Sequence, residues 1–112
     1  MIAHVVLFRP AASLSGDDRE KFVASLERAL SGIPEIRRAH VGRRRILGRA
    51  YDAAGEPFPY AAILEFDSEA DLRTYLDHPA HAELGQRFFT STEAMLVHDF
   101  EMVDAPAARS LL

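Results

Sequence analysis

Two segments of the chain are apolar on both of their alternating faces, and this pattern limits the folds open to it. They are IAHVVLF at 2–8 and YAAILEF at 60–66, rich in the β-branched and aromatic residues typical of strands. Side chains alternate along a strand, so His4 and Phe8 should point to one face of a sheet and Val5 to the other. A sheet with one face in water alternates apolar with polar residues, and these segments do not. We therefore expect helices on one face and a second copy of the chain on the other.

Helical signals separate the strand-like segments in a regular order. Ser15 can cap a helix whose apolar stripe ends near Gly32, where we expect a glycine C-cap. A second helix should open at Ser68 and run to about Asp77, and Pro79 should begin a third. Strands are expected at 2–8, 36–47, 60–66 and 94–103, with a loop at 51–59. This β-α-β-β-α-(α)-β order is the split βαβ arrangement of ferredoxin-like folds, an α+β class with a four-stranded antiparallel sheet.

Length and charge restrict the organisation of the chain and its partners. The 112 residues predict one domain at 2–104 and a tail at 105–112 without clear structure. The net charge of −4 argues against nucleic-acid binding, although residues 36–49 are strongly basic and could attract an anionic small ligand. The absence of cysteine excludes disulfides and thiol chemistry. No segment approaches the roughly 20 apolar residues of a membrane span and no signal-peptide pattern is present, so we expect a cytoplasmic protein without a membrane partner.

The motif His78-Pro79-Ala80-His81 carries the strongest chemical signal. Proline disfavours helical conformation in the residue before it and is tolerated at the first helical position, so His78 should cap a helix and His81 should lie in its first turn. The positive end of the helix dipole should keep His81 neutral and able to act as a general base. The motif could equally serve only to end one helix and start the next, with His81 as a hydrogen-bonded core residue.

A metal site is another interpretation of the two histidines, and the proline argues against it because the two rings then share no rigid helix face. His4 could approach His81, but a carboxylate such as Asp99 or Glu65 would have to complete the set. We therefore expect no metal. His98 should point to the face opposite Asp99, in a packing or dimer contact.

Three stretches resemble the stress-responsive dimeric α/β-barrel (Dabb) family. They are HVVLFR at 4–9, YAAILEFDSEADLRTYLDHPAH at 60–81 and MLVHDFEM at 95–102. The second is the most specific, since it joins a strand, a helix and the HPAH motif. The resemblance covers nearly the whole chain apart from about the last eight residues. It implies a ferredoxin-like protomer that pairs through its sheets into a dimeric α/β barrel.

The family is functionally mixed, and the resemblance to its polyketide cyclases implies roles for particular residues. Those enzymes need no metal or cofactor, so none is expected here. The resemblance implies that His81 is the base, that Tyr75 assists it and that His4 lines the same cavity. Tyr60 and Leu26 replace a histidine and a tyrosine of the cyclase pattern. The residues expected to contact a ligand are Tyr60, Leu26, His78 and Phe88.

Three functions stay open at this point. The first is a dimeric barrel whose sheet–helix pocket binds an apolar or polyketide-like molecule, with cofactor-free cyclase or proton-transfer chemistry as one use of it. The second is a non-catalytic stress-responsive or structural homo-oligomer. The third is a cofactor-independent monooxygenase-like enzyme, against which the HPAH motif and the absence of tryptophan argue. A cavity of roughly 300 Å³ or more around His4, Tyr75 and His81 would favour the first, and a filled core there would rule it out.

Overall fold

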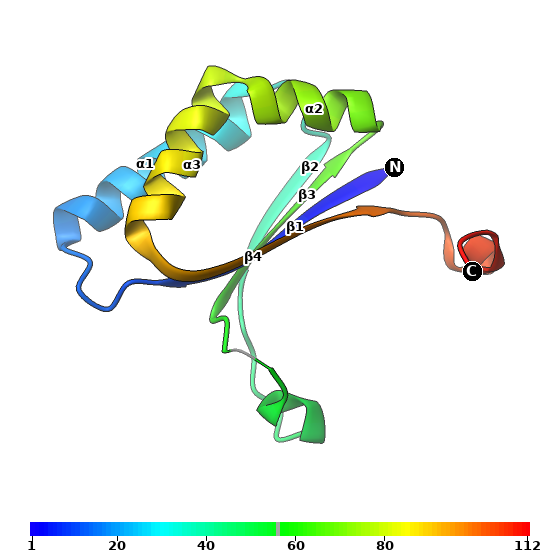
Figure 1. Ribbon diagram of the computed structural model, residues 1–112, viewed down its shortest axis with the longest axis horizontal. Helices are drawn as coiled ribbons and strands as arrows, with labels where there is room; N and C mark the ends of the chain where they lie inside the picture. Colours follow the sequence, from blue (N-terminus) through cyan, green and yellow to red (C-terminus); the bar gives the residue numbers. More distant parts are fainter. Residues whose placement is uncertain (56) are drawn as a thin grey trace.

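A four-stranded sheet carries helices on one face in the computed structural model, which describes residues 1–55 and 57–112 (Figure 1). The elements in chain order are β1 (Ile2–Pro10), α1 (Gly16–Gly32), β2 (Arg38–Arg43), the short 3₁₀ helix η1 (Ala50–Ala53), β3 (Tyr60–Phe66), α2 (Glu69–Asp77), α3 (Pro79–Ser91), β4 (Thr92–Glu101) and the 3₁₀ helix η2 (Ala105–Ser110). The strand order is β2-β3-β1-β4, and every neighbouring pair is antiparallel. The predicted ferredoxin-like α+β class is confirmed.

Serine side chains begin α1 and α2 as the sequence predicts. The hydroxyl of Ser15 accepts a hydrogen bond from the Asp18 N–H at 3.1 Å. The hydroxyl of Ser68 accepts one from the Asp71 N–H, also at 3.1 Å. Each bond satisfies a backbone donor that has no partner inside the helix, which is worth about 1 kcal/mol.

The end of α1 differs from the prediction. Gly32 is the last helical residue, and the cap residue is Ile33, whose φ of −111° and ψ of 104° are extended. The left-handed glycine cap is therefore wrong. Pro34 supplies the reason, because it disfavours helical conformation in the residue before it.

Two other boundaries are also corrected. β2 ends at Arg43 rather than near residue 47. Arg43 pairs with Tyr60, the first residue of β3. The preceding residue of the partner strand is Pro59, which has no N–H to continue the ladder. The tail, predicted to lack structure, forms η2 with Pro106 in its first turn, a position that proline tolerates.

The hydrophobic core lies between the helices and the inner face of the sheet. On β1, His4 and Phe8 are buried on that face while Val5 is only half-buried on the other, so the predicted alternation is confirmed. The largest core residues are Phe8, Phe22, Leu64, Phe66, Leu72, Tyr75, Leu84 and Phe88. Each such side chain contributes about 1.5–3 kcal/mol when it is fully buried.

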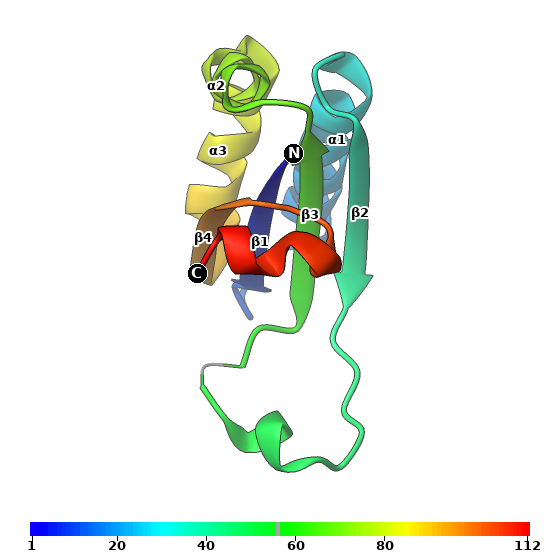
Figure 2. The same cartoon turned by 90° about the vertical axis from the view of Figure 1, so that its right-hand side faces the viewer.

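The outer face of the sheet carries no helix among the described residues. It presents Val5, Leu7, Ile63, Leu96 and Phe100, the last three of them exposed. In Figure 2, η2 lies in front of this face and the β2–β3 loop extends beyond the strand ends. The radius of gyration is 15.4 Å, above the roughly 13 Å of a compact domain of about this length. A large apolar face with projecting segments beside it is typical of an interface.

Candidate functional site

Three elements bring the predicted catalytic residues together between sheet and helices. The ring of Tyr75, near the end of α2, lies between the rings of His4 on β1 and His81 in the first turn of α3. Its centroid is 5.7 Å from that of His4 and 4.7 Å from that of His81, both in edge-to-face geometry. The side chain of Tyr75 is 2% exposed. These three residues form what we call the histidine cluster.

The break between α2 and α3 positions this cluster. His78 has an extended backbone, with φ −72° and ψ 140°, and its N–H donates to the Tyr75 carbonyl at 3.1 Å. Its Nδ1 accepts a hydrogen bond from the Ala80 N–H at 3.0 Å. His78 therefore ends one helix and caps the next, as predicted from the proline that follows it. Its predicted contact with a ligand stays a prediction.

Asp99 is the partner of His4. The two residues are opposite each other in the β1–β4 ladder, and Nδ1 of His4 lies 2.5 Å from Oδ1 of Asp99. This bond fixes the orientation of the imidazole and leaves Nε2 as its second nitrogen. The sequence suggested Asp99 only as a metal ligand. Only the register of two strands almost a whole chain apart could have revealed the pair.

Burial sets the protonation of the other two members. Desolvation lowers the pKa of His81, as does the neighbouring His4, whereas a hydrogen bond to the Leu76 backbone and the charge of Asp77 act in the opposite direction. The sequence prediction of a neutral His81 rested on the helix dipole, and burial lowers the pKa of His81 in the same direction. Desolvation also raises the pKa of Tyr75 to about 12. A neutral imidazole and a protonated phenol therefore lie side by side at pH 7.

Two of the four predicted ligand-contacting residues, Leu26 and Tyr60, lie at the other end of the inner face. A hollow of about 490 Å³, here called the apolar hollow, is lined among others by Phe8, Leu14, Phe22, Val23, Leu26 and Tyr60. Tyr60 stacks on Phe8 at 5.7 Å between centroids. Phe88 is buried, with its ring 5.0 Å from Phe8 and 4.9 Å from Phe22. Phe8 is four strand residues from His4, about 13 Å.

The four hollows described for the protomer do not include the cavity expected around the histidine cluster. Of the four hollows described within residues 1–55 and 57–112, none is lined by His4, Tyr75 or His81. The buried side chains of Val6 and Leu84 occupy the positions between the cluster and the apolar hollow on β1 and α3. An open groove of about 600 Å³ does reach Asp99, which is 44% exposed, together with Leu72 and Leu76.

The described residues form neither a metal site nor a membrane-spanning helix. No group of three or more His, Asp or Glu side chains in residues 1–55 and 57–112 is arranged to hold a metal ion. None of the described helices is both long enough and apolar enough to span a membrane.

Comparison with solved structures shows where this fold occurs. A hydroxynitrile lyase from Passiflora edulis is 23% identical, with a TM-score of 0.77 over 93% of this chain and 94% of that one. A dimeric ferredoxin-like protein of unknown function from Thermobifida fusca is 25% identical, with a TM-score of 0.69 over 90% of both chains. A dimeric protein of ferredoxin-like fold and unknown function from Bacteroides fragilis is also 25% identical, with a TM-score of 0.63 over 90% of this chain and 95% of that one.

Comparison with protein families assigns the chain. A search of curated proteins gave no match. The model of the stress responsive A/B barrel domain matches residues 2–102. Because that match includes β1 through β4 and the whole histidine cluster, the chain belongs to the stress responsive A/B barrel domain family.

Proposed function

We propose that this protein is a homodimeric barrel that binds an apolar or aromatic carbonyl compound between sheet and helices and transfers a proton on it through His81. The observation that carries the proposal is the histidine cluster, in which Tyr75 contacts both His81 and a His4 oriented by Asp99. Enolate chemistry needs a base and a hydrogen-bond donor close together. The cluster provides both, beside an oriented second imidazole.

The reaction class follows from the protonation states. Neutral His81 takes a proton from the carbon beside a carbonyl group, and the electron pair of that C–H bond moves onto the carbonyl oxygen. Protonated Tyr75 donates a hydrogen bond to the enolate oxygen as its charge develops. In a cyclisation, the enolate carbon then attacks a second carbonyl of the same molecule, and the imidazolium returns its proton to the new alkoxide. General-base catalysis of this kind contributes about 10²- to 10⁴-fold in rate.

The apolar hollow supports an apolar or aromatic ligand. Its lining is dominated by aromatic and aliphatic side chains, and its volume of about 490 Å³ lies within the range of small-molecule sites. A ligand that extends from there to His81 has to displace the side chain of Leu84, because it is buried between the two ends. Changes of side-chain rotamer are common on binding, so the proposal requires no backbone movement.

The outer face of the sheet supports the dimer. Its apolar residues from three strands would be covered if two copies packed these faces together, and the relatives from Thermobifida fusca and Bacteroides fragilis are described as dimeric. A stable interface needs about 800 Å² from each partner, which a four-stranded sheet face can supply.

Deuterium exchange into acetophenone tests the proton transfer. The methyl hydrogens of this aromatic ketone are monitored by proton NMR in D₂O with the intact protein, with a His81→Ala variant and with a Gln86→Ala variant. Gln86 is exposed on the same helix as His81 and lies outside the histidine cluster, so it is a matched control. We expect exchange above the buffer rate in the wild type and the control, a loss of about 100-fold in His81→Ala, and nearly equal melting temperatures for all three.

Two results would contradict the proposal. Equal exchange in wild type and His81→Ala would remove the base from the mechanism. If His81→Ala instead mainly unfolds the protein, the histidine is structural.

A non-catalytic structural homo-oligomer is the second candidate. The burial of His4 and Tyr75 and the use of His78 as a helix cap favour it. Thermal unfolding with saturating acetophenone separates the two candidates, because a ligand that binds only the folded state raises its stability. A melting temperature that stays constant up to the solubility limit would favour the structural role.

A further inference from the structure

We infer that the end of the sheet opposite the histidine cluster holds a second binding site, for an aromatic organic anion. The site is a hollow of about 460 Å³ at the foot of the β2–β3 loop, here called the arginine hollow. Its lining includes Arg43, Arg44, Arg45, Tyr51, Asp52 and Phe58. The inference is independent of the proton transfer proposed above, since none of these residues belongs to the histidine cluster. Leu7 and Ala61, which also line the hollow, lie on the outer face of the sheet that the dimer would cover.

The charge of this region is unusual for the chain. Residues 36–51 contain six arginines and no acidic residue, whereas the whole chain has a net charge of −4. Such a local excess of positive charge raises the concentration of anions near the hollow. The three consecutive arginines at its rim concentrate that charge at one point.

Two of these arginines are available to a ligand and one is not. The guanidinium of Arg44 donates to the Asp52 carbonyl at 2.6 Å, so it anchors the loop. The guanidinium groups of Arg43 and Arg45 make no hydrogen bond or ion pair within residues 1–55 and 57–112. Both are exposed, and a guanidinium can bind a carboxylate or phosphate through two parallel hydrogen bonds.

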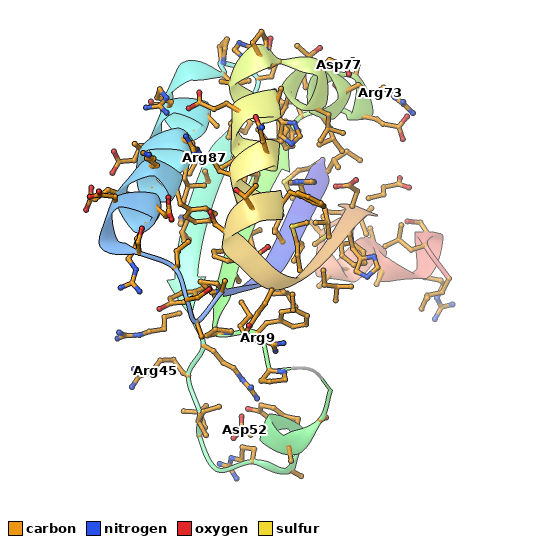
Figure 3. The ribbon with its side chains drawn as sticks, turned by 60° about the vertical axis from the view of Figure 1, so that its left-hand side comes forward. Arg9, Arg45, Asp52, Arg73, Asp77 and Arg87 are labelled. Carbon is orange, nitrogen blue, oxygen red and sulfur yellow. The ribbon has the colours of Figure 1, made fainter. Side chains whose placement is uncertain are left out.

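The carboxylate that lines the hollow does not compete for these arginines. Oδ2 of Asp52 accepts hydrogen bonds from the backbone N–H of Leu47 at 3.1 Å and of Arg49 at 2.8 Å. Figure 3 shows Asp52 between the two limbs of the loop, with Arg45 on the limb that leads into it. The carboxylate therefore orders the loop around the hollow, and a preorganised site loses less entropy on binding.

Aromatic and small side chains complete the hollow and select the ligand class. Tyr51 is 66% exposed although it is a large aromatic residue, and Phe58 lies on the same lining. Gly42 and Ala61 leave room beside them, since even a Cβ at Gly42 would meet no atom within 4 Å. Aromatic faces stack on planar rings, and guanidinium groups bind the anionic substituent. The shared chemistry is a planar ring that carries a carboxylate or a phosphate.

Calorimetric titration of the intact protein with 1-naphthoate tests the inference, with the neutral 1-naphthamide as its matched probe. We expect naphthoate to bind at least about tenfold more tightly than the amide, because a charged hydrogen-bond pair is lost with the charge. Titration with adenosine monophosphate distinguishes the two kinds of anion. Tighter binding of naphthoate identifies carboxylate as the preferred group, and tighter binding of the nucleotide identifies phosphate. Inorganic phosphate that binds as tightly as the nucleotide would overturn the aromatic part of the inference. A twelve-nucleotide single-stranded RNA that binds more tightly than both small anions would overturn the small-molecule assignment.

Variants locate the site. An Arg43→Gln/Arg45→Gln double variant should weaken naphthoate binding at least about tenfold. An Arg73→Gln/Arg109→Gln variant, which loses the same charge from the exposed surfaces of α2 and η2, should stay within twofold. His81→Ala should bind naphthoate like the wild type. A failed naphthoate test is therefore distinguishable from a failed acetophenone exchange test of the proposed function. Unchanged naphthoate binding in Arg43→Gln/Arg45→Gln would overturn the inference. The same holds if this double variant differs from the wild type only in its sedimentation and not in its affinity for naphthoate. Tyr51→Ala provides a second, independent loss of binding.

Discussion

Replacing Tyr75 with phenylalanine removes one oxygen atom from the histidine cluster and keeps its packing. The ring of Tyr75 lies 5.2 Å from that of Phe66, 4.7 Å from that of His81 and 5.7 Å from that of His4. A phenylalanine preserves all three contacts. The hydroxyl of Tyr75 makes no hydrogen bond to any residue that the structure describes. The substitution therefore separates the chemistry of the hydroxyl from the stability of the core.

The two effects differ widely in expected size. A hydrogen bond contributes a net of about 1 kcal/mol to folding, and none is lost here, so the free energy of unfolding should change by less than about 1 kcal/mol. That corresponds to at most about 8 °C in melting temperature for a domain near this size. Loss of a hydrogen-bond donor to a developing oxyanion costs about 10²- to 10³-fold in rate. Tyr75→Ala provides the contrast, because deleting a buried aromatic ring costs about 3–5 kcal/mol.

Acetophenone exchange and urea unfolding, measured on the same preparations, check both expectations. Tyr75→Phe should unfold at nearly the wild-type urea concentration and exchange about 10²-fold more slowly or worse. Exchange at the wild-type rate would refute the role of the hydroxyl as donor. A loss of more than about 2 kcal/mol in stability would show that the hydroxyl is bonded within the folded protein, and the reasoning about packing would then be wrong.

Substitutions at three other sites, His81, Val5 and His78, give further predictions. Because the pKa of folded His81 lies below the value of 6.5 that applies when it is unfolded, the unfolded chain binds more protons between the two values. The contribution of His81 to the free energy of unfolding is therefore full above pH 6.5 and falls as the pH drops toward the folded pKa. His81→Gln should flatten the plot of unfolding free energy against pH over that range. A plot with the wild-type slope would contradict the lowered pKa of His81. Val5→Asp on the outer face of the sheet should split the dimer in sedimentation velocity. Thr74→Asp on the exposed surface of α2 should leave the dimer intact. A dimer that survives Val5→Asp would overturn the assignment of the outer face to the interface. His78→Ala should lower the free energy of unfolding by about 1 kcal/mol through loss of the cap of α3, with His78→Asn near wild type; equal loss in both variants would exclude capping as the cause.

Local patterns predicted the fold well because each depends on a few neighbouring residues. The alternation along 2–8 placed His4 on the inner face, and the proline after His78 separated two helices. The same kind of reasoning failed at Gly32, where a glycine near a helix end suggested a left-handed cap. Pro34 decided that geometry instead, because it restricts Ile33 whatever residue precedes it.

The site was less predictable because its geometry depends on contacts between distant segments. The pairing of His4 with Asp99 requires a strand register that no local signal encodes. The division between the histidine cluster and the apolar hollow depends on how Leu84 and Phe88 fill the inner face. Phe88 was expected to contact a ligand, yet in the protomer it packs against two other aromatic rings.

The spacing of these residues limits the molecule that could use both ends of the inner face. On β1, the cluster and the hollow are marked by His4 and Phe8, about 13 Å apart along an extended strand. On α3, His81 and Phe88 are seven residues and about 10 Å apart along the axis, and this spacing puts them on nearly the same side of the helix. A compound with a single ring and a short side chain, such as acetophenone, would reach only one end, so its exchange reports on occupancy of the end at His81. A substrate that places a carbonyl at His81 while its apolar part fills the hollow therefore has to be elongated, with two or more rings or a chain of comparable length, and the rings of Phe8 and Phe88 would lie along its path.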